Sequence, residues 1–277
     1  TNESSSNSDI NQVIIDSSIQ KIPIYAFNGC KQLTNITIHN FITSIEKNAF
    51  YGCISLTKIS IPSSVTVIKK DTFHKCTSLK EISIPNSIKL IESRAFYKCS
   101  SLQEILMPDC ITSIEVQLFY RCSSLTQIVI PSSVTSIGKY AFGNCISLMK
   151  ITISFPLSLI DDGAFYKCTS IKQISLPISL IRIGKSAFNG CTSLTQIEIP
   201  NGVTSIEDST FNGCSSLTKI IIPISVLSIG ESAFNGCSLL KQISIPKFVT
   251  SVGKLAFSKC TELKEISLPK SITNIGE

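Results

Sequence analysis

Cysteine is the residue type in this chain whose number and spacing could support chemistry. The chain has 277 residues and 12 cysteines. Eleven of the cysteines recur at a fixed interval of 23 residues: Cys30, Cys53, Cys76, Cys99, Cys122, Cys145, Cys168, Cys191, Cys214, Cys237 and Cys260. A thiol can form a disulfide, ligate a metal ion or pack as a small apolar group. These three roles require different geometries, so the geometry that a 23-residue interval predicts distinguishes them.

An interval without a single insertion indicates that equivalent cysteines lie one above another in stacked repeats. Their Cα atoms would be about 5 Å apart, which is within disulfide range, but their Cα–Cβ bonds would run parallel and would not converge. A metal site needs several ligands around one point, whereas one cysteine per repeat forms a line. We therefore expect a ladder of buried free thiols, with no metal site and no cofactor. Free thiols persist most readily under reducing or anaerobic conditions.

Cys110 lies outside this ladder. It occupies a position where other repeats carry serine, such as Ser64, Ser87 and Ser133. We expect its thiol to be exposed to solvent. It is then either a neutral substitute for serine or a reactive thiol that can be oxidised or cross-linked.

The rest of the composition disfavours catalysis and several kinds of partner. The chain has 2 His and no Trp. Neither His39 nor His74 lies in a carboxylate–histidine–nucleophile arrangement, and His74 falls at a turn position that we expect to be exposed. The formal net charge is +6, but the basic residues are scattered, which indicates no nucleic-acid partner. No apolar run is long enough to cross a membrane. We expect a protein that is not an enzyme and does not insert directly into a membrane.

A 23-residue unit repeats along almost the whole chain. Phenylalanine precedes each ladder cysteine by three residues, from Phe27 to Phe257. The unit that begins at Leu217 reads LTKIIIPISVLSIGESAFNGCSL. Eleven units run from residue 10 to residue 262, and a partial twelfth ends the chain. Residues 1–9 are rich in Ser and Asn and are predicted to form a disordered tail or linker. Residues 10–277 are predicted to form one solenoid without a second domain.

The pattern inside one unit predicts two short extended segments and a turn. Ile220 and Ile222 alternate with an outward residue, and Pro223 ends this first strand because it has no N–H to donate. Val226 and Ile229 mark a second extended segment. The Ala-Phe pair that follows suggests one turn of 3₁₀ or α helix. No unit can cover its own apolar face, so parallel strands of successive units must stack to close the core.

The general form of the unit, L-x-x-I-x-I-P-x-x-V-x-x-I-x-x-x-A-F-x-x-C, resembles the leucine-rich repeats of the BspA-like, or treponemal, type. The resemblance covers residues 10–277. It implies an α/β-type leucine-rich repeat solenoid, a β-rich right-handed horseshoe or superhelix. Such a fold has a parallel sheet on the inner face and short extended or 3₁₀ turns on the outer face. The resemblance also implies a non-enzymatic protein, often displayed on cell surfaces, where it serves adhesion.

The two residues between Phe and Cys form the first candidate binding surface. Several repeats carry Asn-Gly there, a turn sequence in which both residues tolerate positive φ. Other repeats replace the Asn by an aromatic residue, and a basic residue follows most of these: Tyr51, His74, Tyr97, Tyr120 and Tyr166, with Lys75, Lys98, Arg121 and Lys167. Stacking should align the first four aromatic residues, with Lys75, Lys98 and Arg121 beside them, into one stripe. The stripe is either neutral variation among turn residues or a surface that binds a partner.

A second candidate surface lies at the outward position between the two Ile of the first strand. Most repeats carry Ser, Thr or Glu there, but Leu106 and Val129, in neighbouring repeats, are apolar. The two residues either pack across strands on a shallow sheet face or form a small exposed patch that receives a partner. Asn2 and Asn35 each begin an N-glycosylation sequon, which matters only if the protein is secreted.

These observations together predict a non-enzymatic interaction module. We expect a cell-surface or secreted adhesion protein or antigen whose partner is a protein or another host-surface component. Two alternatives remain. One is a cytoplasmic scaffold for protein–protein interaction, which the free thiols favour, and the other is the targeting arm of a larger protein whose catalytic domain lies outside this sequence.

Overall fold

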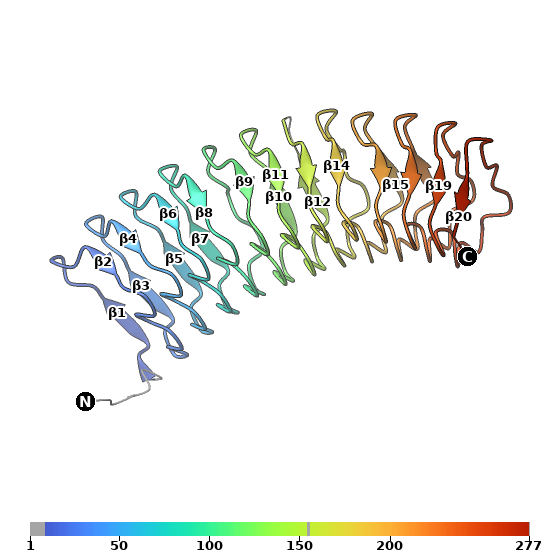
Figure 1. The fold of residues 1–277 in the computed structure, drawn as a ribbon. Coiled ribbons are helices and arrows are strands. Elements are labelled where there is room, and N and C mark those ends of the chain that lie inside the picture. Colours follow the sequence, from blue (N-terminus) through green and yellow to red (C-terminus); the bar gives the residue numbers. More distant parts are fainter. Residues whose placement is uncertain (1–8, 154–155, 277) are drawn as a thin grey trace.

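The computed structural model describes residues 9–153 and 156–276, which form a solenoid with one 23-residue repeat per coil. Figure 1 shows a curved row of coils, with the two ends of the chain at opposite ends of the row. Paired strands run parallel, and each residue pairs with the residue 23 positions later, as Gln12 does with Asn35. The predicted parallel-strand solenoid is confirmed. The predicted tail, residues 1–9, lies outside the described residues except for Asp9.

The first strand of a coil has three residues. These strands are β1 (Gln12–Ile14), β3 (Asn35–Thr37), β5 (Lys58–Ser60), β7 (Glu81–Ser83), β10 (Gln127–Val129), β12 (Lys150–Thr152), β15 (Gln196–Glu198) and β17 (Lys219–Ile221). They pair in twos: β1 with β3, β5 with β7, β10 with β12 and β15 with β17. Residues 103–106, between β7 and β10, form no strand, and neither do residues 242–244, which follow β17. The first-strand face of the solenoid is therefore a series of two-stranded sheets rather than one continuous sheet.

The second strand of a coil has two residues and is present in every coil. These strands are β2 (Lys21–Ile22), β4 (Ser44–Ile45), β6 (Val67–Ile68), β8 (Leu90–Ile91), β9 (Ser113–Ile114), β11 (Ser136–Ile137), β13 (Leu159–Ile160), β14 (Arg182–Ile183), β16 (Ser205–Ile206), β18 (Ser228–Ile229), β19 (Ser251–Val252) and β20 (Asn274–Ile275). They form two-stranded sheets toward the N-terminus and two four-stranded sheets farther along, β14-β13-β11-β9 and β16-β18-β19-β20. This second set of strands gives the stack its more continuous pairing.

The core is a stack of repeated side chains, one layer per coil. The phenylalanine rings from Phe27 to Phe257 stack face to face, with centroids of neighbouring rings 5.2–5.7 Å apart. The rings from Phe50 to Phe234 are fully buried, whereas the terminal rings Phe27 and Phe257 are only partly covered. Each ring is thus packed by the coil before it and the coil after it, as expected for a solenoid.

The segment that contains Ala and Phe is a run of turns, and the described residues contain no helix there. The predicted turn of helix is therefore wrong. In this segment every second backbone N–H donates to the next coil, as Phe50 N–H does to Thr72 O, whereas the N–H groups between them donate three residues back, as Ala49 N–H does. The positive φ of Asn48, 60°, interrupts the run of such turns, because a helix needs successive residues with negative φ. An N–H that donates to the next coil is not available for the i→i−4 bond of an α-helix.

The structure explains why cysteine recurs at this position of the repeat. Each thiol from Cys53 to Cys260 donates a hydrogen bond to the carbonyl oxygen of the phenylalanine 26 residues earlier, at 3.0–3.2 Å. All cysteines are free, and those of the ladder are buried, except Cys260, which is half-buried. The expected ladder of free thiols is confirmed. Cysteine suits this position because it is a small apolar residue that still donates weakly.

We expect one fast-reacting thiol in the native protein. Burial raises the pKa of the ladder thiols, to about 12 for Cys53 and Cys191, so they are protonated and covered at pH 8, whereas the thiolate is the reactive form. Titration with Ellman's reagent should detect Cys110 rapidly, Cys260 slowly, and all 12 cysteines after denaturation in guanidinium. Mapping of several disulfides in the native protein by mass spectrometry would contradict the thiol ladder.

Candidate functional site

The aromatic residues of the turns form a continuous stack on the surface of the solenoid. The ring centroids are 4.6 Å apart for Tyr51 and His74, 4.4 Å for His74 and Tyr97, and 5.1 Å for Tyr97 and Tyr120. The planes of neighbouring rings differ by only 20–23°. The expected alignment of these four residues is confirmed. Whether they bind a partner stays a prediction.

The stack continues through two tyrosines that the predicted stripe does not include. The Tyr140 ring meets Tyr120 edge to face with centroids 6.2 Å apart, and it meets Tyr166 in the same way at 5.9 Å. We call the six rings Tyr51, His74, Tyr97, Tyr120, Tyr140 and Tyr166 the aromatic column. All are half-buried except His74. The column spans six successive coils.

Tyr140 enters the column from a different position of the repeat, two residues before the core phenylalanine. The regular position in its coil is Gly143, and a Cβ atom there would lie 2.8 Å from Tyr120 Cδ2. A Cβ atom at Gly163, in the next coil, would overlap the Tyr140 ring. The two glycines therefore leave the space that the Tyr120 and Tyr140 rings occupy. The sequence could have indicated this arrangement, because position 143 lacks the aromatic residue of the neighbouring coils and position 140 carries an additional one.

His74 differs from its neighbours in the column because it is buried. Only 3% of the residue is exposed, so the expectation of an exposed turn position is wrong. Its Nδ1 lies 2.7 Å from Asp71 Oδ1, and Arg94 Nε lies 3.0 Å from the same oxygen, although this N–H has no well-aligned hydrogen-bond acceptor. Burial lowers the pKa of His74, and the hydrogen bond and charge of Asp71 oppose this effect. A neutral ring that donates from Nδ1 fits both observations.

The flanking basic residues hold their charges over the column. Lys75 Nζ lies 5.5 Å from the centroid of Tyr51, Lys98 Nζ 5.6 Å from that of Tyr97, and Arg121 Cζ 5.6 Å from that of Tyr120. Lys167 Nζ lies 5.3 Å from the Tyr166 centroid. Such distances are typical of cation–π contacts. We call Lys75, Lys98, Arg121 and Lys167 the flanking cations.

The flanking cations also adopt a backbone conformation that favours glycine. Their φ angles are 61°, 59°, 62° and 55°, at the position where other coils carry Gly29, Gly52, Gly190, Gly213 and Gly236. The preceding residue has no positive φ, in the Asn-Gly coils or in the aromatic ones. Both residues of an Asn-Gly turn tolerate positive φ, but only the second adopts it in this structure. A non-glycine residue costs about 1–2 kcal/mol in this conformation, so the cations are retained against a local preference for glycine.

The second candidate surface, on the first-strand face, consists of two exposed apolar side chains. Leu106 is 87% exposed and Val129 is 62% exposed. Val129 pairs with Thr152 in the β10–β12 ladder, but Leu106 lies in residues 103–106, which form no strand. Among the described residues, no ladder therefore joins the two apolar positions. Both interpretations of the pair, packing across the coils and a small exposed patch, stay predictions.

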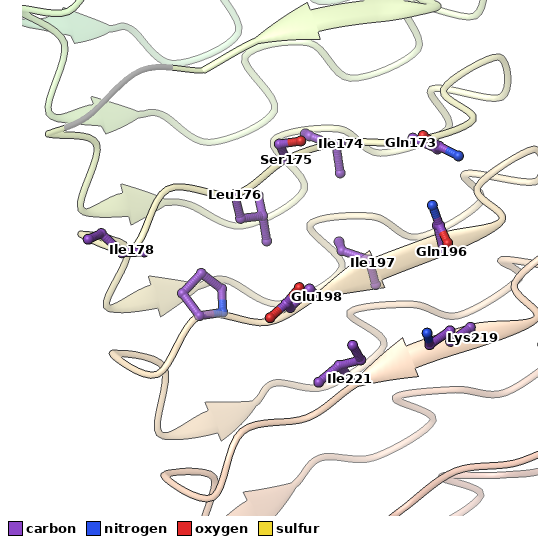
Figure 2. Close-up of a pocket in the computed structure, with 11 residues that line it drawn as sticks. Gln173, Ile174, Ser175, Leu176, Ile178, Gln196, Ile197, Glu198, Lys219 and Ile221 are labelled. Carbon is purple, nitrogen blue, oxygen red and sulfur yellow. The ribbon is translucent and has the colours of Figure 1, made fainter.

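A shallow groove of about 450 Å³ lies farther along the same face, where the strand pairing weakens. The segment before β15 is joined to it by the isolated bridge of Gln173 to Gln196. Figure 2 shows Leu176 and Ile178 on one side of β15, and Ile221 of β17 on the other, with Glu198 between them. Ile178 is 87% exposed, and the sequence reasoning missed it because it lies outside the first-strand positions. The groove brings together no group of residues that could act in catalysis.

The other candidate positions are separate from these surfaces. Cys110 is exposed as expected, and it lacks the hydrogen bond that serine makes at this position, where Ser133 Oγ donates to Ile111 O at 2.5 Å. Its reactivity stays a prediction. Asn35 is exposed at the start of β3, whereas Asn2 lies outside the described residues. Glycosylation at either position is untested.

The described residues contain neither a candidate metal cluster nor a membrane-spanning helix. In residues 9–153 and 156–276, no three His, Cys, Asp or Glu residues come together as a group that could hold a metal ion. In the same ranges, no helix is long and apolar enough to span a membrane.

Comparison with known proteins extends the resemblance seen in the repeat. Residues 2–126, 43–172 and 158–277 match a family profile described as BspA type leucine rich repeat region. A solved leucine-rich repeat protein from Bacteroides ovatus is 30% identical, with a TM-score of 0.67, over 96% of this chain and 82% of that one. A leucine rich cell surface protein from Faecalibacterium prausnitzii is 29% identical, with a TM-score of 0.55, over 96% and 87% of the two chains. None of the curated proteins matches this chain.

Proposed function

Because the chain belongs to the family of BspA-type leucine-rich repeat proteins, we propose that it is a surface adhesion module that binds a macromolecular partner through the aromatic column. Leucine-rich repeat solenoids generally act as non-catalytic scaffolds that bind proteins, since their extended faces vary while the core repeats. The likeness to a bacterial cell surface protein supports display outside the cell. The absence of enzymatic activity stays a prediction.

The observation that carries the proposal is the aromatic column with its flanking cations. Tyrosine and arginine are enriched among the residues that dominate binding energy at interfaces, because they supply large contact area, hydrogen bonds and cation–π contacts. The six aromatic rings occupy successive coils without a gap, since Tyr140 occupies the space beside Gly143. The cations next to them adopt positive φ where glycine would be less strained.

We expect the column to be required for adhesion. Beads coated with the protein should attach to monolayers of mucosal epithelial cells, and Tyr97→Asn with Tyr120→Asn should reduce the affinity roughly thirtyfold, since truncated anchors typically cost about 2 kcal/mol. Asn is the residue that other coils carry at this position, for example Asn189 and Asn212. Folding should therefore be preserved, which circular dichroism can check. Attachment is measured as a function of protein density on the beads.

The matched control changes the other candidate surface. Leu106→Ser with Val129→Thr also uses residues that other repeats carry, and it removes exposed apolar area from the first-strand face. Attachment should be unchanged in this variant. If the control pair abolishes attachment and the tyrosine pair does not, the first-strand face is the binding surface. If neither pair matters, or if the wild-type beads do not attach, the proposal fails.

A further inference from the structure

We propose that the partner of the aromatic column is an acidic segment of extended polypeptide that runs along the column, parallel to the axis of the solenoid. This inference rests on the proposed function, because it specifies the ligand of the same surface. Three features of the column carry it: the faces of the inner stacked rings are covered, the exposed polar side chains can all donate hydrogen bonds, and the positive charges are not neutralised.

The faces of the inner rings of the stack, His74 and Tyr97, are not available to a ligand. Tyr51, His74, Tyr97 and Tyr120 cover one another's faces at centroid distances of 4.4–5.1 Å. Lys75, Lys98 and Arg121 lie over the same rings. What remains for a partner is the ring edges, which carry the positive part of the aromatic quadrupole. A positive edge favours acceptors and anions over apolar or stacked groups.

The exposed polar side chains of the column can all donate hydrogen bonds. In the part of the chain that the structure describes, the phenol oxygens of the five tyrosines of the column have no hydrogen-bond partner, and none is among the buried unpaired atoms. These hydroxyls are therefore open to solvent and free to donate. Ammonium and guanidinium groups can only donate. A carboxylate can only accept, so it matches this surface.

The charges of the flanking cations are not balanced by acidic neighbours. Elsewhere, bases pair with acids of an adjacent coil, as Lys58 does with Glu81 at 2.9 Å and Lys185 with Asp208 at 2.8 Å. Over residues 9–153 and 156–276, no ion pair involves Lys75, Lys98, Arg121 or Lys167. The acid within the column, Asp71, is buried against His74 and Arg94. The surface that a partner meets is therefore positive.

The spacing of the cations suits an extended peptide. Lys75, Lys98 and Arg121 come from successive coils, and Lys167 follows two coils later. Coils rise by about 5 Å, so the four charges span about 20 Å, which six or seven residues of extended chain cover at about 3.3 Å each. Side chains on one face of an extended chain are about 6.6 Å apart, a mismatch of about 1.6 Å per coil that flexible Lys and Arg side chains can absorb. A partner with an acidic residue at every second position would meet each cation.

An anionic polysaccharide is the competing ligand, and the covered rings argue against it. Aromatic side chains recognise sugars mainly by stacking an open ring face on the sugar ring, and in the stacked part of the column neighbouring rings and cations cover the inner faces. A polysaccharide would keep only the charge contacts. An acidic peptide can form ion pairs with the flanking cations and accept hydrogen bonds from the tyrosine hydroxyls, and its extended backbone can follow the rise from coil to coil.

The test measures binding of a fluorescein-labelled peptide of five Glu-Ser repeats by fluorescence anisotropy. We expect saturable binding that weakens with added salt, and at least tenfold weaker binding of a Gln-Ser peptide of equal length. Arg121→Gly should lower the affinity about tenfold, because it removes a charge-assisted hydrogen bond. The matched control is Lys259→Gly, which removes one positive charge at the same position of the repeat, with φ 57°, but next to Ser258 instead of an aromatic ring. This control should change the affinity less than twofold.

Other outcomes overturn the inference. Equal losses for Arg121→Gly and Lys259→Gly would show attraction by net charge without a site. Tighter binding of a heparin oligosaccharide than of the Glu-Ser peptide at equal charge would assign the surface to polysaccharides. If the peptide does not bind but bead attachment still depends on Tyr97 and Tyr120, the ligand class is wrong and the proposed function stands. If attachment is independent of both tyrosines, the proposed function fails as well.

Discussion

Replacing Phe142 by alanine is expected to lower the free energy of unfolding by about 3–5 kcal/mol. The Phe142 ring is fully buried and stacks on Phe119 and Phe165 at centroid distances of 5.4 and 5.5 Å. Its loss leaves a cavity that neighbouring coils cannot close, because their backbones are fixed by hydrogen bonds on both sides. Equilibrium unfolding in urea, followed by far-UV circular dichroism, measures the change.

The same substitution at the end of the stack should act differently. Phe27 stacks on Phe50 alone and is only partly buried. Because stability in a solenoid is close to a sum of nearest-neighbour terms, Phe27→Ala should fray the first coils and leave the main transition almost unchanged. Equal losses of stability and cooperativity at both positions would contradict nearest-neighbour stabilisation.

Replacing Gly163 by alanine is expected to cost about 3 kcal/mol, the second-largest effect. A Cβ atom at this position would overlap the Tyr140 ring, and overpacking of this kind typically costs about 1–3 kcal/mol. The positive φ of 61° adds about 1–2 kcal/mol for any residue with a side chain. Thermal and urea unfolding of the variant give the total.

A double-mutant cycle separates the two contributions. Tyr140→Ser removes the ring and introduces the residue that other coils carry at this position, as at Ser186 and Ser209. In that background Gly163→Ala should cost only about 1–2 kcal/mol, the backbone part. Gly213→Ala gives the reference, since its φ is 71° but the atoms nearest to an added Cβ lie 3.7 Å away or more. An equal cost of Gly163→Ala with and without Tyr140 would show that Tyr140 is not seated against this glycine.

The architecture could be predicted from the sequence because each coil repeats the same contacts. A strict 23-residue interval puts equivalent side chains in register, so the phenylalanine stack, the thiol ladder and the alignment of Tyr51, His74, Tyr97 and Tyr120 all follow from one argument. The Asn-Gly turn also pointed to positive φ, although only the second residue adopts it.

What could not be predicted depends on contacts between non-equivalent positions. Tyr140 joins the column from outside the aromatic position, because Gly143 and Gly163 leave it space. His74 is buried because Asp71, three residues earlier, accepts its hydrogen bond. The thiol ladder required a donor as well as a small side chain, since each Sγ bonds to a carbonyl of the preceding coil. An alignment of the repeats shows which residues occupy equivalent positions, so it does not show these contacts between different positions of the repeat.

Hydroxyl-radical footprinting of the protein on epithelial cells tests most directly the claim that the aromatic column is the contact surface. Oxidation of each side chain is compared, by mass spectrometry, between the free protein and the cell-bound protein. We expect oxidation of Tyr97, Tyr120 and Tyr166 to fall severalfold on binding, while oxidation of the exposed Leu106 and Val129 does not change. Protection of Leu106 and Val129 with unchanged oxidation of the three tyrosines would contradict this expectation.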